Sequence, residues 1–168
     1  ILNIGLKMES SSKLVSVVIP TYGRGVELSY AVDSALSQTY ANIEIIIVDD
    51  NDSIENINEV KTQLGKYSDN KKITYLGDGV NRGGAGARNF GISHANGVYI
   101  TFLDDDDFYD PKKIEKQLFH LEKESLDVSV CDLHFCEDGE LKDVSNCYAR
   151  VNSLKDFIIK GNCYTPMI

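Results

Sequence analysis

Apolar residues occur along the first two thirds of the chain in short runs separated by segments of helical periodicity. Residues 15–20 (VSVVIP) and 43–48 (IEIIIV) are rich in β-branched side chains and have few polar positions. Such runs are typical of strands that are covered on both faces. Residues 73–76 and 98–103 form two shorter apolar runs. The pattern therefore predicts four strands.

Between these runs, apolar residues recur every three or four positions, as expected of amphipathic helices. The spacing predicts helices over residues 25–38 and 54–64, and another that follows the glycine-rich turn NRGGAGA and runs through His94. Asn96-Gly97 is a typical signal for the end of that helix. Pro111 is expected to open a further helix, because proline fits the first helical turn.

Strand and helix thus alternate four times with short connections. This order predicts an α/β fold with right-handed crossovers and a mostly parallel sheet that carries helices on both faces. In such sheets ligands bind beyond the carboxyl ends of the strands. Residues 1–14 are a polar lead-in, residues 128–135 are expected to form a fifth strand, and Ser153 to cap a short helix over 154–160.

Composition and charge exclude several classes of protein. A chain of 168 residues suits one domain, and its net charge of -9 argues against nonspecific binding to nucleic acids. The sequence has no apolar stretch near the roughly 20 residues that span a bilayer. The irregular spacing of the four cysteines favours reduced thiols over a metal site or disulfides: Cys131, Cys136, Cys147 and Cys163.

Four consecutive aspartates, Asp104 to Asp107, follow the fourth predicted strand. If the extended chain continues, Asp104 and Asp106 share one side. Two carboxylates about 6 Å apart repel by roughly 2–3 kcal/mol at an effective dielectric constant near 20. A divalent cation removes that cost, and hard oxygen ligands suit Mg²⁺ or Mn²⁺. A solvated acidic loop is the alternative, but the position at a strand end favours a cation site.

Other residues near the predicted strand and helix ends could bind a nucleotide. Asp49 and Asp50 end the second strand and could accept hydrogen bonds from a ribose hydroxyl or a base N–H, although turn or cap residues are the alternative. Tyr22 could stack on a base or be an ordinary half-buried tyrosine. Arg88, near the start of the third helix, favours a nearby anion or base carbonyl, with a surface ion pair as the alternative.

Two other patterns are weaker. Gly84 and Gly86 form a G-x-G, but Asn89 replaces the third glycine of a dinucleotide-binding motif and the strand before it is the third. Residues 50–52 (DND) are similar to the start of an aspartate-nucleophile phosphatase, although they follow the second strand. A metal-dependent phosphatase or nucleotidyltransferase therefore stays an alternative. The three histidines form no H-x-x-x-H cluster.

Taken in order, four segments resemble the inverting nucleotide-sugar glycosyltransferases of family 2, which have the GT-A fold. The segments are VSVVIPTYGR, AVDSALSQTYANIEIIIVDDND, NRGGAGARNFGI and GVYITFLDDDDFYDP, and they cover about residues 15–111. The later IIKGNCYTPMI resembles the segment before the acceptor-binding half. The resemblance implies one GT-A (Rossmann-like) domain over 15–168, with the nucleotide-sugar part at 15–111 and the start of the acceptor side at 112–168.

The resemblance also implies roles for individual residues. Tyr22 would lie against the base, Asp50 would accept the N–H of a uracil or similar ring, and Arg88 would help to hold the base or the diphosphate. Asp106 would be the main metal ligand, with Asp104 also at the metal. The nucleotide-binding residues implied in this way are Pro20, Thr21, Tyr22, Arg24, Asp50, Arg88, Asp104 and Asp105. Asp107 is expected to be structural.

The activity implied by the resemblance is transfer of a sugar, with inversion, from a nucleotide-diphosphate sugar to an acceptor hydroxyl. A UDP-sugar, an Mn²⁺ or Mg²⁺ ion and a carbohydrate or lipid-linked acceptor are expected, in polysaccharide or glycoconjugate synthesis. The metal would neutralise the leaving diphosphate and a carboxylate base would deprotonate the acceptor. We expect this base and the rest of the acceptor half beyond Ile168, so a binding module without turnover is the alternative.

Two departures from the family pattern leave the identity of the base open. Gly23 stands where asparagine is usual, and Asn51-Asp52 where a glycine-serine pair is common. Both change the loops near the nucleotide. The expected location is the cytoplasm, with peripheral association at the inner membrane face as a further possibility.

Overall fold

The computed structural model describes residues 13–129, 131, 134–137 and 140–143. Strands and helices alternate up to residue 124, as the sequence pattern predicts. The elements are β1 (Val15–Thr21), α1 (Gly25–Leu36), β2 (Ile43–Asp49), α2 (Ile54–Leu64), the 3-10 helix η1 (Gly65–Tyr67), β3 (Ile73–Leu76), α3 (Gly83–Ser93), β4 (Tyr99–Phe102), α4 (Lys113–Glu124), β5 (His134–Glu137) and β6 (Glu140–Asp143).

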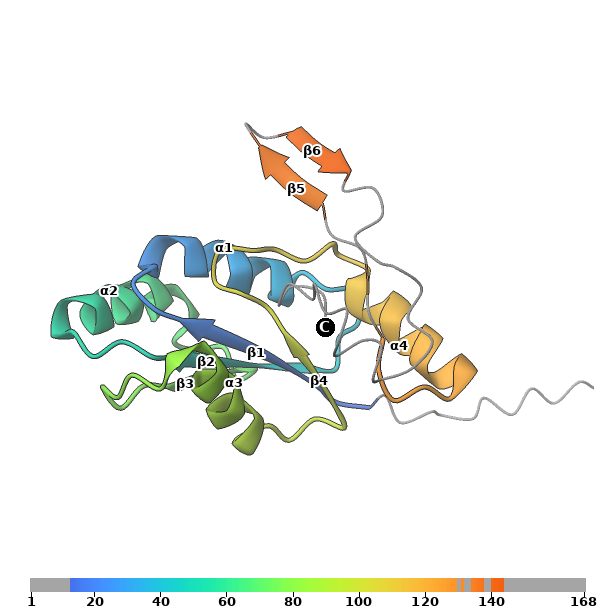
Figure 1. The fold of residues 1–168 in the computed structure, drawn as a ribbon, viewed down its shortest axis with the longest axis horizontal. Helices are drawn as coiled ribbons and strands as arrows, with labels where there is room; N and C mark the ends of the chain where they lie inside the picture. Colours follow the sequence, from blue (N-terminus) through green and yellow to red (C-terminus); the bar gives the residue numbers. More distant parts are fainter. Residues whose placement is uncertain (1–12, 130, 132–133, 138–139, 144–168) are drawn as a thin grey trace, which may run out of the picture.

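The first four strands form one sheet in the order β3-β2-β1-β4 (Figure 1). All three neighbouring pairs are parallel, which confirms the prediction of an α/β fold with a parallel sheet. In the register of the central pair, Thr21 lies opposite Asp49. The carboxyl ends of β1 and β2 therefore lie side by side, and β4 ends on the other side of β1.

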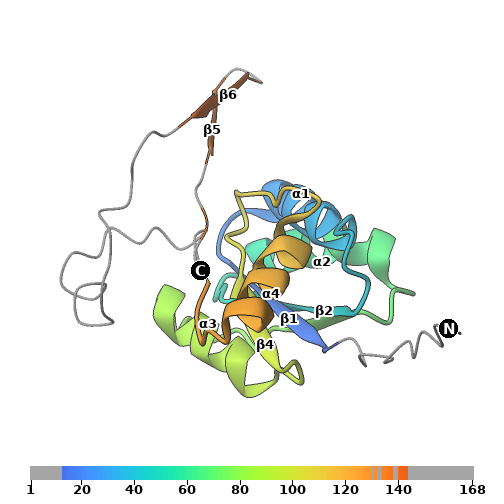
Figure 2. The same cartoon turned by 90° about the vertical axis from the view of Figure 1, so that its right-hand side faces the viewer.

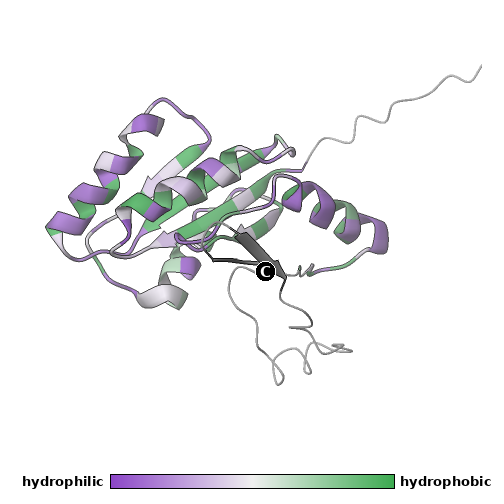
Figure 3. Cartoon of the chain, turned by 90° about the horizontal axis from the view of Figure 1, so that it is seen from above, coloured by the Kyte–Doolittle hydropathy of each residue, from purple (hydrophilic) through white to green (hydrophobic). Residues whose placement is uncertain are grey.

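Helices cover both faces of this sheet, and Figure 2 shows α1 and α3 on opposite sides of it. Alternate residues of β1 explain this arrangement, because Val17 and Ile19 face one core and Val18 faces the other. The larger core also contains residues of α1, α2 and α4, and the smaller one contains Ala87 of α3. Full burial of each such aliphatic side chain contributes about 1.5–3 kcal/mol. The hydropathy colouring of Figure 3 shows the same division, with green strands between helices whose outer sides are largely purple.

Helix α3 begins earlier than the sequence pattern predicts. It starts at Gly83, so three of its first four residues are the glycines that were expected to form a turn. Gly83 has a φ of +69°, a conformation that favours glycine. Another glycine explains the close approach of α3 to the sheet, since a Cβ on Gly91 would lie 2.4 Å from Cγ1 of Val18. Packing therefore outweighs the low helix propensity of glycine here.

The region after β3 differs from the predictions in three further details. β4 is shorter than predicted, and α4 starts at Lys113 because the N–H of Lys113 closes a turn on the carbonyl of Asp110 at 2.9 Å. The expected strand over 128–135 is wrong in its bounds, since Val128 is not in a strand and β5 starts at His134. β5 pairs with β6 in an antiparallel sheet of its own.

Some predictions fall on residues that the structure does not describe, namely most of the lead-in over 1–14 and the helix over 154–160. Cys131 forms no disulfide with any other described residue, and the reduced state of the four cysteines stays a prediction. Among the helices that are described, none has the length and apolar character needed to cross a membrane.

Candidate functional site

The residues selected from the sequence come together at one edge of the sheet. Thr21 ends β1, Asp50 follows β2, and the aspartate run begins two residues after β4. Because the strands are parallel and β1 lies between β2 and β4, their carboxyl ends meet at the same edge. The structure thus assembles residues that lie far apart in the sequence, such as Thr21 and Asp105, which are 84 positions apart.

Asp105 is the most buried member of the aspartate run, with 3% of its surface exposed. Its Oδ2 accepts hydrogen bonds from the Thr21 hydroxyl at 2.7 Å and from the N–H of Tyr22 at 3.3 Å. Its Oδ1 accepts a hydrogen bond from Nη1 of Arg24 at 3.1 Å. Asp105 therefore ties the end of β4 to the end of β1. A contact between Asp105 and the ribose stays a prediction. The ribose hydroxyl would have to bind carboxylate oxygens that already accept these hydrogen bonds.

Asp106 differs from Asp105 in exposure, because 47% of its side chain is open to solvent. Its Oδ2 lies 3.0 Å from Nη1 of Arg24, so one guanidinium group bridges both carboxylates. The hydrogen bond to Asp105 and the charge of Asp106 raise the pKa of Arg24. Of these two aspartates, Asp106 is the one whose carboxylate is accessible to a ligand.

Asp104 pairs with Arg88, which comes from α3. Both side chains are mostly buried, with 24% and 21% exposed, and Nη2 of Arg88 donates to Oδ1 of Asp104. Nη1 of Arg88 donates to the carbonyl of Gly84 at 3.1 Å. Its Nε is buried and has no hydrogen-bond partner among the described residues. Arg88 thus lies at the aspartate run, in a half-buried ion pair, and its contact with a base or diphosphate stays a prediction.

Asp107 shows that the run is a turn and not an extended strand, because its N–H donates to the carbonyl of Asp104 at 3.1 Å. The alternation of side chains expected for an extended run is therefore wrong here. Burial, and then the charges of the three preceding aspartates, raise the pKa of Asp107 to about 6. Two arginines contact the run, so its four carboxylates outnumber the positive charges that pair with them.

The donor set fits a divalent cation. It consists of carboxylate oxygens in a region of negative charge, and hard cations such as Mg²⁺ and Mn²⁺ prefer such ligands. Within the described part of the chain, no three histidine, cysteine or acidic side chains are grouped to hold a metal by themselves. Asp106, with help from Asp104, would supply part of the coordination shell. Water or phosphate oxygens would have to complete it.

Asp50 is held on the other side of β1 and is 4% exposed. Its N–H donates to the carbonyl of Thr21 at 3.0 Å, and its Oδ1 accepts a hydrogen bond from the N–H of Arg82 at 2.7 Å. The neighbouring Asp49 accepts a hydrogen bond from the Tyr75 hydroxyl at 2.6 Å, and burial, followed by this contact, raises the pKa of Tyr75. Tyr75 and Arg82 were not identified from the sequence.

Gly23 and Asn51, which both depart from the family pattern, contact each other. Asn51 is fully buried, and its Oδ1 accepts a hydrogen bond from the N–H of Gly23 at 2.8 Å. Gly23 has a φ of +71°, which favours glycine. That Gly23 and Asn51 both differ from the family pattern in the same sequence was the available signal that the two residues contact each other. This contact shapes the loop that carries Tyr22. The Tyr22 residue is 54% exposed, and Pro20 is half-buried within β1.

Comparison with known proteins supports a specific family. The family described as Glycosyl transferase family 2 matches residues 16–165. An uncharacterized glycosyltransferase of Haemophilus influenzae is 36% identical over 124 residues, which are 74% of this chain and 48% of that protein. The Escherichia coli protein WfaP, named UDP-Glc:alpha-D-GlcNAc-diphosphoundecaprenol beta-1,3-glucosyltransferase, is 35% identical over 143 residues, 83% of this chain and 54% of that one. The chain thus spans about half the length of these two relatives.

Solved structures agree on the fold. TarS of S. aureus superposes with a TM-score of 0.55 at 23% identity, covering 65% of this chain and 32% of that one. The mannosyltransferase PcManGT of Pyrobaculum calidifontis, solved with GDP-Man and Mn²⁺, gives 0.56 at 23% identity, with 64% and 32% covered. These similarities confirm the GT-A-type α/β fold. On the family match and the sequence relatives, the chain belongs to glycosyltransferase family 2.

Proposed function

We propose that this chain binds a nucleotide-diphosphate sugar and forms the donor side of an inverting, metal-dependent glycosyltransferase. The observation that carries the proposal is the convergence of Thr21, Tyr22, Asp50 and the aspartate run at one sheet edge. Two arginines lie at the same edge, where they pair with the aspartate run. The family assignment supports the same reaction class.

Each part of the site has a role in this proposal. The exposed ring of Tyr22 lies against the base, and the carboxylate of Asp50 accepts a ring N–H. Asp106 is the main metal ligand and Asp104 supports it. When bound, Mn²⁺ or Mg²⁺ supplies positive charge beside the leaving diphosphate. Arg24 pairs with Asp105 and Asp106, and Arg88 pairs with Asp104, which lowers the mutual repulsion of these carboxylates.

The names of the relatives support a UDP-sugar as donor and a lipid-linked acceptor. WfaP is named as a transferase that uses UDP-Glc and a diphosphoundecaprenol-linked sugar, and a second E. coli relative, WfgD, carries the same activity in its name. An acceptor of this kind would place the reaction at the inner membrane face, in polysaccharide or glycoconjugate synthesis. The donor sugar and the linkage stay open.

A melting experiment tests the nucleotide proposal. UDP should raise the melting temperature of the protein in the presence of Mn²⁺, because a ligand that binds only the folded state stabilises it. Without the metal the rise should be smaller. GDP and CDP serve as comparison ligands. The proposal is wrong if no nucleoside diphosphate shifts the melting temperature under either condition. Turnover of a UDP-sugar with an acceptor would exclude a module that binds without catalysis.

Two single variants test the assignment within the aspartate run. Asp106→Ala should abolish the metal-dependent part of the UDP shift while the fold survives, because its carboxylate is exposed. Asp107→Ala should have a smaller effect on binding. The reverse order of these effects would show that the roles within the run are assigned to the wrong residues. Circular dichroism of both variants provides the control for folding.

A further inference from the structure

The loop over residues 77–82, between β3 and α3, contacts a residue of the proposed nucleotide site. The N–H of Arg82 donates to Oδ1 of Asp50 at 2.7 Å, across 32 positions in the sequence. Among the contacts of the described residues, Oδ1 is the carboxylate oxygen of Asp50 that receives a hydrogen bond. Oδ2 receives no hydrogen bond from the described residues, and Asp50 as a whole is 4% exposed. The direction in which Oδ2 points depends on where the loop holds the N–H of Arg82.

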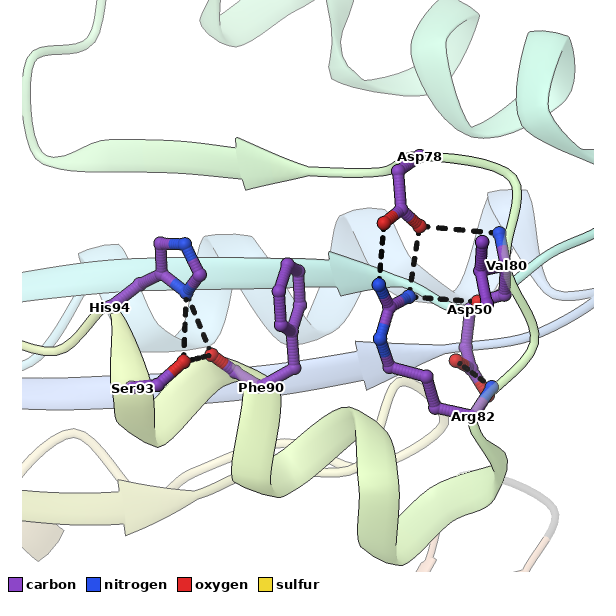
Figure 4. A network of polar contacts seen from close by, with 7 residues as sticks. All are labelled: Asp50, Asp78, Val80, Arg82, Phe90, Ser93 and His94. Carbon is purple, nitrogen blue, oxygen red and sulfur yellow. Dashed lines mark hydrogen bonds and ion pairs between the residues drawn. The ribbon is translucent and has the colours of Figure 1, made fainter.

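The Arg82 side chain is held on three sides, as Figure 4 shows. Its guanidinium group donates to both oxygens of Asp78, with Nη1–Oδ1 at 2.8 Å and Nη2–Oδ2 at 2.5 Å. Nη1 also donates to the carbonyl of Val80 at 2.9 Å. Cζ of the group lies over the Phe90 ring, 4.1 Å from its centroid. A bidentate, stacked arginine of this kind has little rotational freedom.

Phe90 connects this arrangement to the core. Its ring packs against the smaller core cluster, which includes Val18 of β1 and Ala87 of α3. His94 contacts the same ring edge-on, with centroids 4.6 Å apart (Figure 4). The Arg82 side chain therefore anchors the loop to a fixed surface, while the Arg82 backbone holds Asp50.

The loop depends on this anchor because its own residues are permissive. Gly77 and Gly79 flank Asp78, and Gly79 has a φ of +75°. Glycine has the largest backbone freedom of all residues, so the loop has little intrinsic preference for one conformation. The hydrogen bond from Arg82 lowers the pKa of Asp78 to about 2, and the pair is therefore charged at physiological pH.

We propose that Arg82 is a positioning residue for base selectivity, which acts by holding its own N–H on Asp50 and so orienting the free carboxylate oxygen toward the nucleotide base. This inference rests on the proposed function, since the contact of Asp50 with a base is part of it. An ionised carboxylate accepts hydrogen bonds and donates none. It favours uracil, which has a ring N–H, over cytosine, whose corresponding ring nitrogen is an acceptor.

Binding of UDP and CDP in the presence of Mn²⁺, measured by calorimetry, tests the proposal. Arg82→Ala should weaken UDP binding about tenfold and lower the ratio of UDP to CDP affinity by a similar factor, because a charged hydrogen-bond network holds the loop. For Arg82→Lys, the UDP affinity and the ratio of UDP to CDP affinity should lie between those of the unaltered protein and of Arg82→Ala. Lysine keeps the charge but cannot form the bidentate contact. If Arg82→Ala weakens both ligands equally, Arg82 has only a structural role and the proposal is overturned.

Lys66→Ala provides the matched control. Lys66 forms an ion pair with Asp33 at 2.9 Å, and their side chains are 50% and 54% exposed. This pair joins η1 to α1, away from the loop over 77–82, so its removal should leave the ratio of affinities unchanged. A similar loss of selectivity in Lys66→Ala would show a nonspecific effect and would also overturn the proposal.

A second measurement needs no ligand and separates this inference from the proposed function. Asp78→Asn keeps an acceptor oxygen but removes the charge that holds Arg82. Hydrogen exchange of the Arg82 amide should then become about tenfold faster, because the loop opens more often. Unchanged exchange would overturn the anchor whether or not a nucleotide binds. Absence of nucleotide binding by the unaltered protein would instead refute the proposed function.

Discussion

Asp105 illustrates how much of this site depends on single oxygen atoms. The side chain is buried, and its contacts with Thr21, Tyr22 and Arg24 join the ends of two strands. The resemblance to family 2 implied that all four residues belong to one site. It did not indicate that Asp105 contacts the protein while Asp106 stays exposed, because that difference depends on a turn in the run.

Removal of one hydrogen-bond donor to Asp105 should lower the stability of the fold. Thr21→Val deletes the hydroxyl that donates to Oδ2 of Asp105 and leaves a buried carboxylate with fewer hydrogen bonds. We expect a loss of about 1–3 kcal/mol in the free energy of unfolding, measured with urea. Thr74→Val on β3, where the side chain is exposed, is the control and should change stability by less than about 0.5 kcal/mol. Equal effects would contradict the role of the Thr21 hydroxyl.

At the scale of elements, α3 shows where sequence patterns and packing disagree. Its glycines are typical of a turn, yet the segment is a helix that lies close to the sheet. Arg82 lies just before α3 and Arg88 lies within it, so the position of this helix determines where both arginines meet the site. The close approach is possible because Gly91 has no side chain.

Gly91→Ala should therefore destabilise the fold although alanine favours helices. The new Cβ would meet Val18 at 2.4 Å and Val48 at 3.1 Å, and overpacking of this kind costs about 1–3 kcal/mol. Gly65→Ala is the matched control, since nothing lies within 4 Å of its Cβ position and its φ of -54° suits alanine. It should stabilise the protein by about 0.4–1 kcal/mol. Thermal unfolding of both variants checks the opposite signs.

At the opposite, amino-terminal edge of the sheet, Glu44 of β2 connects β1 to the loop before β4. This side chain accepts hydrogen bonds from the Ser16 hydroxyl at 2.6 Å and from the N–H of Asn96 at 2.6 Å. Burial opposes ionisation, but these hydrogen bonds outweigh it and lower the pKa of Glu44. A carboxyl group whose folded pKa is lowered stabilises the fold above its unfolded value, here near 4.5, and this contribution is lost as the pH falls through the folded pKa.

Glu44→Gln should remove that dependence on pH. At pH 7 we expect a loss of about 1 kcal/mol in the free energy of unfolding, since the charged hydrogen bonds are only partly shielded from water. Below the folded pKa of Glu44 the variant and the unaltered protein should become similar. Urea titrations at pH 7, 5 and 3 test this, with Asp69→Asn in the exposed loop before β3 as the control. A constant difference at all three values would contradict the linkage.

For the molecule as a whole, charge determines what the site can bind. The net charge is -9, and the site edge itself carries the aspartate run. A nucleoside diphosphate is also an anion, so the protein field opposes its approach. The arginines at this edge already pair with carboxylates. A divalent cation is therefore the group that would reverse the local sign of the potential.

Removal of metal should weaken nucleotide binding strongly. With EDTA in place of Mn²⁺ at matched ionic strength, we expect the affinity for UDP to fall roughly tenfold or more, because charge repulsion is then unscreened by the cation. Mn²⁺ alone should bind weakly, since no three metal-binding side chains are grouped in the described part of the chain. Calorimetry with UDP, Mn²⁺ and both together measures this coupling. Equal affinity for UDP in EDTA would contradict the role of the metal.

The sequence by itself determined the order of strands and helices up to α4, the parallel sheet and the edge at which the candidate residues meet. Hydrophobic periodicity is local and specifies which face of an element is buried, and parallel strands bring their carboxyl ends together. Only the tertiary structure decided the contacts between individual atoms. The pairs Thr21–Asp105 and Asp50–Arg82 depend on a turn, a glycine-rich loop and the packing of α3. Hydrogen bonds require atoms to be placed within a few tenths of an ångström, and no local pattern in the sequence carries that information.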